Sequence, residues 1–319
     1  MTVVACTFGA PGTSGETEEL LTIARELSAS QGTGLRWLVA GPAPRPAIEE
    51  LGAEYGITSI DQIDDPKLEA VAPDASVEAL AQYCASRPPT TILLSQTFDA
   101  RLIAPRLAGR LNAAVVMNAL ELEVAGDALL VTASAYGGDT RAVYELPGDG
   151  PHVIAMMPNA TSPDAAPGET PGIENVAVDL STVEERVRLI ERTAEEGPRL
   201  EDAQIIVGGG RGLGAADKFA LVEELAAALG GLPAASRPIV DDGWADSSRQ
   251  IGLTGKITRP ALYVAAGISG ASQHMAGCAA AKTIVAINSD PDAPIFRYAR
   301  YGIVGDCLEV LSELTSALR

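Results

Sequence analysis

The last third of the chain carries four short turns, each placed after a short apolar run, and this arrangement constrains the fold more than any other feature. The turns are 208–214 (GGGRGLG), 235–238 (ASRP), 250–256 (QIGLTGK) and 267–274 (GISGASQH). A turn between a strand and a helix directs backbone N–H groups and a positive helix end at an anion, and glycine allows close approach. The four turns together therefore predict a site for a large anionic cofactor.

Composition limits the possible partners. The 319 residues include 23 Lys plus Arg against 42 Asp plus Glu, a formal charge of −19, and only 4% aromatic residues. Such a charge repels nucleic acid and acidic membranes, and few aromatic side chains are left to stack on bases. No apolar run approaches the ~20 residues that span a bilayer. The run Val3–Ala5 is too short for a signal peptide and lacks a basic flank. We therefore expect a cytoplasmic protein without membrane or nucleic-acid contacts.

Strand-like and helix-like segments alternate in both halves of the chain. In the first half we predict strands at 2–7, 35–40, 57–60 and 91–95, and helices at 16–29, 46–53, 77–86 and 100–110. Short β runs at 121–124, 129–133 and 153–157 predict a meander, and 159–172 reads as a loop. In the second half we predict helices at 217–229 and 308–318 and strands at 239–240, 261–266, 283–288 and 303–304. This alternation is typical of parallel sheets with right-handed crossovers.

The length favours about two domains. The best linker candidate is 194–199, which contains Gly197-Pro198. We therefore predict an α/β protein with domains at 1–197 and 198–319, each a mainly parallel sheet flanked by helices.

The first turn leaves several kinds of site open. Gly210–Ala215 fits the loose pattern GxGxxG/A between a strand and a helix, but this pattern alone is weak evidence. No clear acidic residue for a ribose follows about 20 residues on, which disfavours an ordinary dinucleotide site. A Walker loop fails because no Lys-Ser/Thr follows Gly214. A tight turn without any ligand remains possible at this stage.

The two histidines have different surroundings. His274 begins a short helix after a glycine turn, where its ring could present a cationic or donating nitrogen to a ligand, or could be a satisfied partly buried residue. His152 is interpreted as structural. Ser269, His274 and Asp290 could form a hydrolytic triad only in principle, because no GxSxG elbow is present.

The cysteines form no CxxC pair, so they indicate neither a zinc site nor a redox dithiol. We interpret them as buried small apolar side chains. They are Cys6, Cys84, Cys278 and Cys307.

Six strings in order between Gly209 and Leu318 resemble the C-terminal domain of the electron transfer flavoprotein α subunit. They are GGRGLG, ASRPIVDDGW, QIGLTGK, GISGASQHMAG, VAINSDPDAPIF and YGIVGD. The first 190 residues match more loosely, through APRLAGRL at 104–111 and the meander. The resemblance implies a Rossmann-like (DHS-like) FAD-binding C-terminal domain. It also implies an N-terminal domain of the adenine-nucleotide-hydrolase-like α/β fold, with a β meander, that contacts a partner subunit.

The resemblance implies an electron carrier without substrate chemistry of its own. One FAD would be bound by this chain, which would pair obligately with a β subunit that holds AMP or a second FAD. Electrons would come from acyl-CoA dehydrogenases of fatty-acid β-oxidation or related enzymes and pass to a quinone oxidoreductase or another acceptor. The rival hypothesis is a regulatory module that binds an adenine nucleotide such as NAD without redox chemistry.

The resemblance also assigns cofactor-binding positions. They are Arg211, Ser236, Arg237, Ile251, Gly252, Leu253, Thr254, Ser269, Gly270, Ala271, Ser272, Gln273, His274, Asn288, Asp306 and Cys307. Among these, Arg237, Thr254 and His274 are expected to tune the flavin. A unit charge 4 Å away contributes roughly 4 kcal/mol at an effective dielectric constant of about 20. Half of that would shift a one-electron potential by ~80 mV.

Two positions depart from the family pattern. Leu253 stands where the family usually has glutamine, and Cys307 where it usually has leucine. The first change removes a polar side chain from the flavin loop, so the potential or a ribityl contact is expected to differ.

Overall fold

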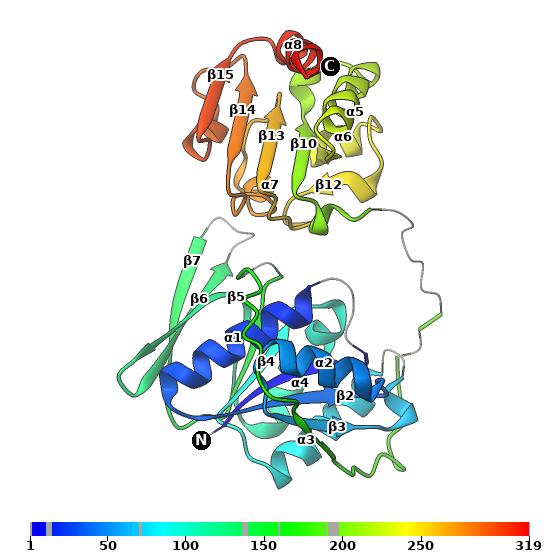
Figure 1. Cartoon of the computed structure of the whole chain (residues 1–319), viewed down its shortest axis with the longest axis vertical. Coiled ribbons are helices and arrows are strands. Elements are labelled where there is room, and N and C mark those ends of the chain that lie inside the picture. The colour runs from blue at the N-terminus through cyan, green and yellow to red at the C-terminus, as the bar shows by residue number, and fades with distance from the viewer. Residues whose placement is uncertain are drawn as a thin grey trace. The chain divides into compact units, whose positions relative to one another are not determined.

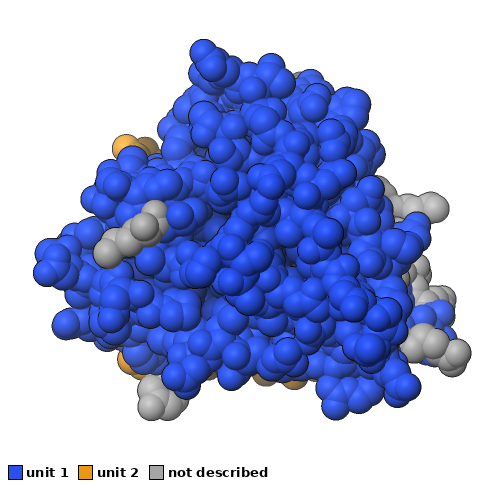
Figure 2. Space-filling model, turned by 90° about the horizontal axis from the view of Figure 1, so that it is seen from below, with its two compact units in different colours: residues 1–135, 141–192 blue, residues 136–140, 193–319 orange. Residues whose placement is uncertain are grey.

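The computed structural model describes residues 2–10, 15–69, 72–135, 140–158, 160–187, 189–190 and 198–318. The chain separates into two compact units (Figures 1 and 2). Unit 1 comprises residues 1–135 and 141–192, and unit 2 comprises residues 136–140 and 193–319. Most of the predicted linker at 194–199 lies outside the described residues.

Unit 1 is built on a nine-stranded sheet in the order β7-β6-β5-β8-β4-β1-β2-β3-β9. Its strands are β1 (Thr2–Phe8), β2 (Gly34–Ala40), β3 (Ser59–Ile63), β4 (Thr91–Ser95), β5 (Ala114–Ala125), β6 (Ala128–Ala135), β7 (Thr140–Pro147), β8 (His152–Met156) and β9 (Gly172–Asn175). Its α-helices are α1 (Glu16–Gln31), α2 (Arg45–Glu54), α3 (Pro73–Ser86) and α4 (Phe98–Leu111). In the sheet order, every neighbouring pair in the run β5-β8-β4-β1-β2-β3-β9 is parallel. The pair of β5 and β6 is antiparallel.

The two faces of this sheet are buried by different helices, as the pleat of β1 shows. Val3 and Ala5 pack with apolar side chains of α1 and α2, while Val4 and Cys6 pack with those of α3 and α4. A strand buried on both faces reads as a continuous apolar run rather than an alternating one. This is why the run 2–7 could be recognised as a buried strand.

Two parts of unit 1 differ from the sequence-based expectation. β8 does not belong to the meander, because it inserts between β4 and β5 and is parallel to both. β9 begins at Gly172, the last residue of the predicted loop, and pairs with β3 at the edge of the sheet. Sequence patterns report burial along a strand, but they do not report which distant strand lies beside it.

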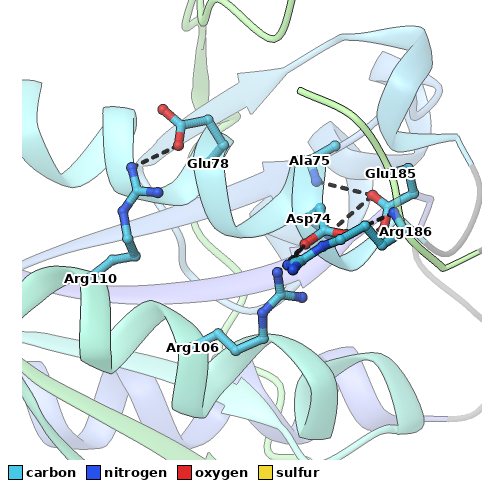
Figure 3. A network of polar contacts seen from close by, with 7 residues as sticks. All are labelled: Asp74, Ala75, Glu78, Arg106, Arg110, Glu185 and Arg186. Carbon is cyan, nitrogen blue, oxygen red and sulfur yellow. Dashed lines mark hydrogen bonds and ion pairs between the residues drawn. The ribbon is translucent and has the colours of Figure 1, made fainter. Parts of the chain in front are cut away.

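A network of charged groups fixes the segment 176–187, which is neither helix nor strand, to α3 and α4 (Figure 3). The carboxylate of Glu185 accepts hydrogen bonds from the backbone N–H groups of Asp74 and Ala75 in the first turn of α3. The Asp74 carboxylate in turn pairs with Arg106 of α4 and, at 2.6 Å, with Arg186. These bonds hold the pKa of Asp74 well below its ordinary value, with Arg186 the main cause.

Unit 2 contains a six-stranded sheet in the order β12-β11-β10-β13-β14-β15, in which all neighbouring strands are parallel. The strands are β10 (Ile205–Gly209), β11 (Leu232–Ser236), β12 (Gln250–Ile251), β13 (Leu262–Ala266), β14 (Ile284–Asn288) and β15 (Tyr301–Val304). The α-helices are α5 (Phe219–Ala228), α6 (Arg237–Asp241), α7 (Ser272–Met275) and α8 (Cys307–Ala317). Counted along the chain this is the order 3-2-1-4-5-6, the doubly wound arrangement whose ligand site lies where the order reverses, beside β10 and β13.

Each face of the second sheet has its own core. Val207 points into the cluster formed with α5 and α8, whereas Ile206 points to the opposite face with Met275 and Ile295. The N-terminus of α8 is capped by Asp306, whose carboxylate accepts from the N–H of Leu308 at 2.8 Å. The core is mainly aliphatic and alanine-rich.

The predicted strand at 239–240 is wrong, since these residues lie in α6. Pro238 stands in the first turn of this helix, where a missing N–H is tolerated and the fixed φ angle suits a helix. The apolar pair Ile239-Val240 is too short for its periodicity to separate a strand from a helix. The strand of this region is β11, which ends just before at Ser236.

Candidate functional site

A pocket of about 650 Å³ lies at the carboxyl ends of the parallel strands of unit 2. It is lined by residues from the ends of β11, β12 and β14 and from the turns that follow β10 and β13. The lining residues are Arg211, Gly212, Ser236, Arg237, Pro238, Asp241, Gln250, Ile251, Gly252, Leu253, Thr254, Gly267, Ile268, Ser269, Ala271, Gln273, His274, Asn288, Asp290, Ala293 and Pro294. The pocket thus occupies the place where a doubly wound sheet binds its ligand.

Twelve of the sixteen predicted cofactor-binding residues line this pocket. The other four are Gly270, Ser272, Asp306 and Cys307. Asp306 caps α8, and the Cys307 thiol lies 3.4 Å from the carbonyl oxygen of Gly212, so Cys307 contacts the first turn. The assignment of these four residues to a ligand stays a prediction.

Glycine allows the first and fourth turns to touch through their backbones. The N–H of Gly212 donates to the carbonyl of Gly267 over 3.0 Å. A Cβ atom on Gly212 would lie 2.6 Å from the Cα of Gly267, which itself has a φ of +64°. Only glycine fits this approach and this backbone conformation. The two turns beside the reversal point are therefore locked to each other before any ligand binds.

The His274 side chain is 8% exposed and hydrogen-bonded on one side only. Its Nε2 lies 2.8 Å from the hydroxyl oxygen of Tyr263, while its Nδ1 makes no hydrogen bond of acceptable geometry to any described residue. Burial lowers the pKa of His274 to about 4, and the nearby backbone of Ile251 opposes this only in part. A pKa this low favours the neutral imidazole at pH 7, and thus the donating form over the cationic form that the sequence analysis also allows.

The two arginines of the pocket lie at its rim. Nε of Arg237 is 3.3 Å from a carboxylate oxygen of Asp241, and Nε of Arg211 is 3.5 Å from one of Asp242. Both arginine side chains are more than 60% exposed, and exposed pairs of this kind contribute only about 0–1 kcal/mol. A phosphate or a reduced ring could therefore compete with these carboxylates for the guanidinium groups.

Smaller polar groups complete the walls. The hydroxyl of Thr254 accepts a hydrogen bond from the amide of Gln250 at 3.0 Å, which fixes the third turn. The amide of Asn288 donates to the carbonyl of Ile268 at 2.9 Å, which connects β14 to the fourth turn. Ser236, at the end of β11, is buried on the pocket wall.

Nine lining residues are absent from the predicted list of cofactor-binding positions. They are Gly212, Pro238, Asp241, Gln250, Gly267, Ile268, Asp290, Ala293 and Pro294. Five of them, Gly212, Pro238, Gln250, Gly267 and Ile268, lie inside the four turns, so their position after a strand was an available signal. Ala293 and Pro294 come from a loop beyond β14, and nothing in the local pattern brings that loop back over the pocket.

The remaining sequence-based predictions concern metal sites, cysteines, His152 and membrane-spanning helices. Among the described residues, no cluster of His, Cys, Asp and Glu has the arrangement of a metal site. All four cysteines are buried and free, which confirms their interpretation as small apolar side chains. His152 is also buried, and its Nε2 is hydrogen-bonded to the carbonyl of Pro147. In the described part of the chain no helix is both long and apolar enough to cross a bilayer.

Comparison with known proteins agrees with this geometry. Residues 199–279 match the electron transfer flavoprotein FAD-binding domain, and residues 13–181 match the electron transfer flavoprotein domain. The chain is 36% identical to the electron transfer flavoprotein subunit alpha of Thermoanaerobacterium thermosaccharolyticum, over 94% of this chain and 92% of that protein. The chain belongs to the electron transfer flavoprotein α-subunit family. It is also 35% identical to the FixB protein of Clostridium saccharobutylicum, over 93% and 89% of the two chains. The corresponding protein of Megasphaera elsdenii is 34% identical, over 94% and 91%.

Membership of the electron transfer flavoprotein α-subunit family means that unit 2 carries an FAD-binding domain, and the pocket fits this cofactor. Its volume lies within the roughly 300–1,000 Å³ typical of cofactor sites. Serine and threonine hydroxyls, two rim arginines and one buried imidazole nitrogen without a partner supply the polar groups that a phosphorylated ring system needs. The family and the geometry thus indicate the same site.

Proposed function

We propose that the pocket of unit 2 binds FAD through its twelve predicted lining residues and that the chain acts as the α subunit of a two-subunit electron carrier. The observation that carries this proposal is the position of these residues at the reversal point of the sheet, inside a segment that matches an FAD-binding domain. In this proposal residues 198–319 form the cofactor domain. Residues 1–197 form the domain that contacts the partner subunit.

FAD, when bound, supplies reversible one-electron chemistry, and the protein supplies position and electrostatics. Thr254 would place its hydroxyl beside the ring from the third turn. Arg237 would approach the ring from the start of α6 by exchanging its weak contact with Asp241. His274 would donate a neutral N–H from the fourth turn. Donors and a cation around the ring stabilise its reduced forms, which raises the reduction potential.

The buried imidazole contributes in a way that an exposed cation does not. A guanidinium that is 62% exposed is screened by water and salt, whereas His274 is almost fully removed from solvent. A hydrogen bond from His274 would therefore act at short range and keep its geometry. We propose that His274 sets the local polarity of the ring and Arg237 adds a screened charge.

The partners follow from the family and remain part of the proposal. The relatives' names describe an α subunit, so we propose an obligate β subunit that carries AMP or a second FAD. We further propose acyl-CoA or related dehydrogenases as electron donors and a quinone oxidoreductase or similar acceptor. The chain itself would carry out no substrate chemistry.

The test is to co-express the chain with its β subunit and measure the flavin content and reduction potential of the complex. We expect bound FAD in the wild type, and in Arg237→Ala a lower potential with FAD retained. Lys218→Ala, which also removes a partly exposed cation of unit 2 but lies outside the pocket lining, is the matched control and should keep the wild-type potential. A complex whose extracted ligand is an adenine nucleotide without flavin absorbance would contradict the proposal.

A further inference from the structure

Tyr263 is a fully buried residue of β13 whose hydroxyl is hydrogen-bonded to His274. The hydroxyl oxygen of Tyr263 lies 2.8 Å from Nε2, and the two ring centroids are 6.0 Å apart at an angle of 34°. The thiol of Cys278, one turn after His274, points to the backbone carbonyl of His274 at 3.5 Å. The imidazole is thus fixed from the side of the sheet, below the pocket that it lines.

Gly208 shows that the fold makes room for this hydroxyl. Gly208 lies in β10, next to β13, and a Cβ atom built there would be 2.3 Å from the hydroxyl oxygen of Tyr263. Glycine inside a strand costs stability and often marks a place where another group approaches closely. The absence of a side chain at Gly208 therefore leaves space for the Tyr263 hydroxyl, whereas the absence of one at Gly212 allows the backbone contact between the turns.

The surrounding groups favour one direction for this hydrogen bond. A neutral imidazole has one donor nitrogen and one acceptor nitrogen, and a buried hydroxyl needs an acceptor for its proton. Nε2 is the nearby strong acceptor, because the sulfur of Cys278 accepts hydrogen bonds only weakly. When Tyr263 donates to Nε2, the imidazole proton must be on Nδ1.

We propose that Tyr263 is a positioning residue that holds His274 in the Nδ1–H tautomer, so that His274 offers a neutral N–H donor to an acceptor atom of the pocket ligand. The proposal rests on the proposed function only in taking that ligand to be FAD. The reverse arrangement, with Nε2–H donating to the tyrosine oxygen, would give the pocket an acceptor nitrogen instead. These two arrangements make opposite predictions for the ligand, so the tautomer decides between them.

The sequence offers a direct measurement, because the chain has only two histidines. Nε2 of His152 is hydrogen-bonded to the carbonyl of Pro147 and must therefore be a donor. In a long-range proton–nitrogen NMR spectrum of the ¹⁵N-labelled full-length chain with its unlabelled partner subunit at pH 7, we expect His152 as Nε2–H and His274 as Nδ1–H. A His152→Gln or His274→Gln variant assigns the two signals. A His274 signal of the Nε2–H or imidazolium type would overturn the proposal.

Tyr263→Phe removes the hydroxyl and keeps the ring. We expect the Nδ1–H signal of His274 to give way to a mixture of tautomers. In the FAD-loaded complex we expect the equilibrium constant of the first one-electron reduction to fall about tenfold, which is 59 mV. Tyr144→Phe is the matched control, because Tyr144 is 46% exposed in unit 1, and it should change neither reading. An unchanged tautomer in Tyr263→Phe would overturn the proposal.

A second variant tests the proposal independently in case Tyr263→Phe does not fold. Gly208→Ala keeps the tyrosine but places a methyl group against its hydroxyl, so the same change in tautomer is expected, and an unchanged tautomer would contradict the proposal. The tautomer can also be read before FAD is added to the complex. Failure of this inference therefore appears in the nitrogen spectrum, whereas failure of the proposed function appears as an absence of bound flavin.

Discussion

The charged network of unit 1 and the pocket of unit 2 differ in how their polar groups are hydrogen-bonded. Around α3 the carboxylates of Asp74 and Glu185 are met by arginines and backbone N–H groups of the same chain (Figure 3). In the pocket, His274 keeps a buried nitrogen without a geometrically acceptable partner in the described residues, and the walls approach through glycine. Polar groups that are satisfied by their own chain indicate a structural role, whereas polar groups that line a cavity are available to a ligand.

The largest expected effect comes from the backbone contact between the turns. Gly267→Ala would add a Cβ atom 2.8 Å from the backbone of Gly212 at a φ of +64°. We expect a loss of roughly 2–5 kcal/mol in the free energy of unfolding, from left-handed strain plus overpacking, and loss of FAD binding. Chemical denaturation and flavin content measure these two effects.

Gly230→Ala is the matched control for that variant. Gly230 has a φ of +67°, but no atom lies within 4 Å of its Cβ position. It should cost only the strain of about 1–2 kcal/mol and keep FAD. Equal losses in the two variants would show that the contact between the turns is not what assembles the pocket.

The next effect is the pH dependence that His274 imposes. The unfolded chain protonates this histidine at about pH 6.5, whereas the folded chain protonates it only at about pH 4. Because the unfolded state binds the extra proton between these values, stability falls as the pH drops from 6.5 to 4. In the FAD-free chain, wild type should therefore lose about 3 kcal/mol relative to His274→Gln over this window. Urea unfolding at pH 7, 5 and 4 measures the difference, and a constant difference would disprove a buried neutral imidazole.

The network of unit 1 should give a smaller effect that leaves the cofactor untouched. Asp74→Ala should cost about 2 kcal/mol of stability, as expected for hydrogen bonds to a charged group, with unchanged FAD content. Arg110→Ala is the control, since its pair with Glu78 is 2.7 Å long but the arginine is 55% exposed. It should cost less than ~1 kcal/mol. Loss of flavin in Asp74→Ala would end the distinction between a structural and a ligand-binding network.

The smallest effect is expected at Leu253, the position at which the family resemblance leads us to expect glutamine. Leu253→Gln would return an amide donor to the third turn beside the pocket. One added neutral hydrogen bond to the reduced ring should raise the potential of the FAD-loaded complex by roughly 20–60 mV. Potentiometric titration measures this shift. Leu253→Met is the control, because methionine is about as long as glutamine but has no hydrogen-bond donor. An equal shift in both variants would assign the effect to packing.

Much of the fold and of the pocket could be predicted because their signals are local. The buried strand at 91–95 appears in the structure with the same bounds, since its apolar run is both continuous and bounded by turn residues. The four turns converge because parallel strands end at one edge of a sheet, so turns distant in sequence become neighbours.

The rest depended on tertiary contacts that no local pattern reveals. The state of His274 is an example, because its neutrality comes from burial against Tyr263, which lies on a different element. The role of Gly208 is another, since the sequence shows a glycine but not the hydroxyl that occupies its space. The capping of α3 by Glu185 joins residues 110 or more positions apart.

The burial of the sulfur atoms has a consequence for the working life of an electron carrier. Burial raises the pKa of Cys84 and of Cys278 to about 12 and that of Cys6 further. At neutral pH these groups are thiols rather than thiolates, and it is the thiolate that attacks peroxides and disulfides as a nucleophile and is thereby oxidised. A redox protein can in this way pass electrons repeatedly without turning its own side chains into targets of the oxidants around it.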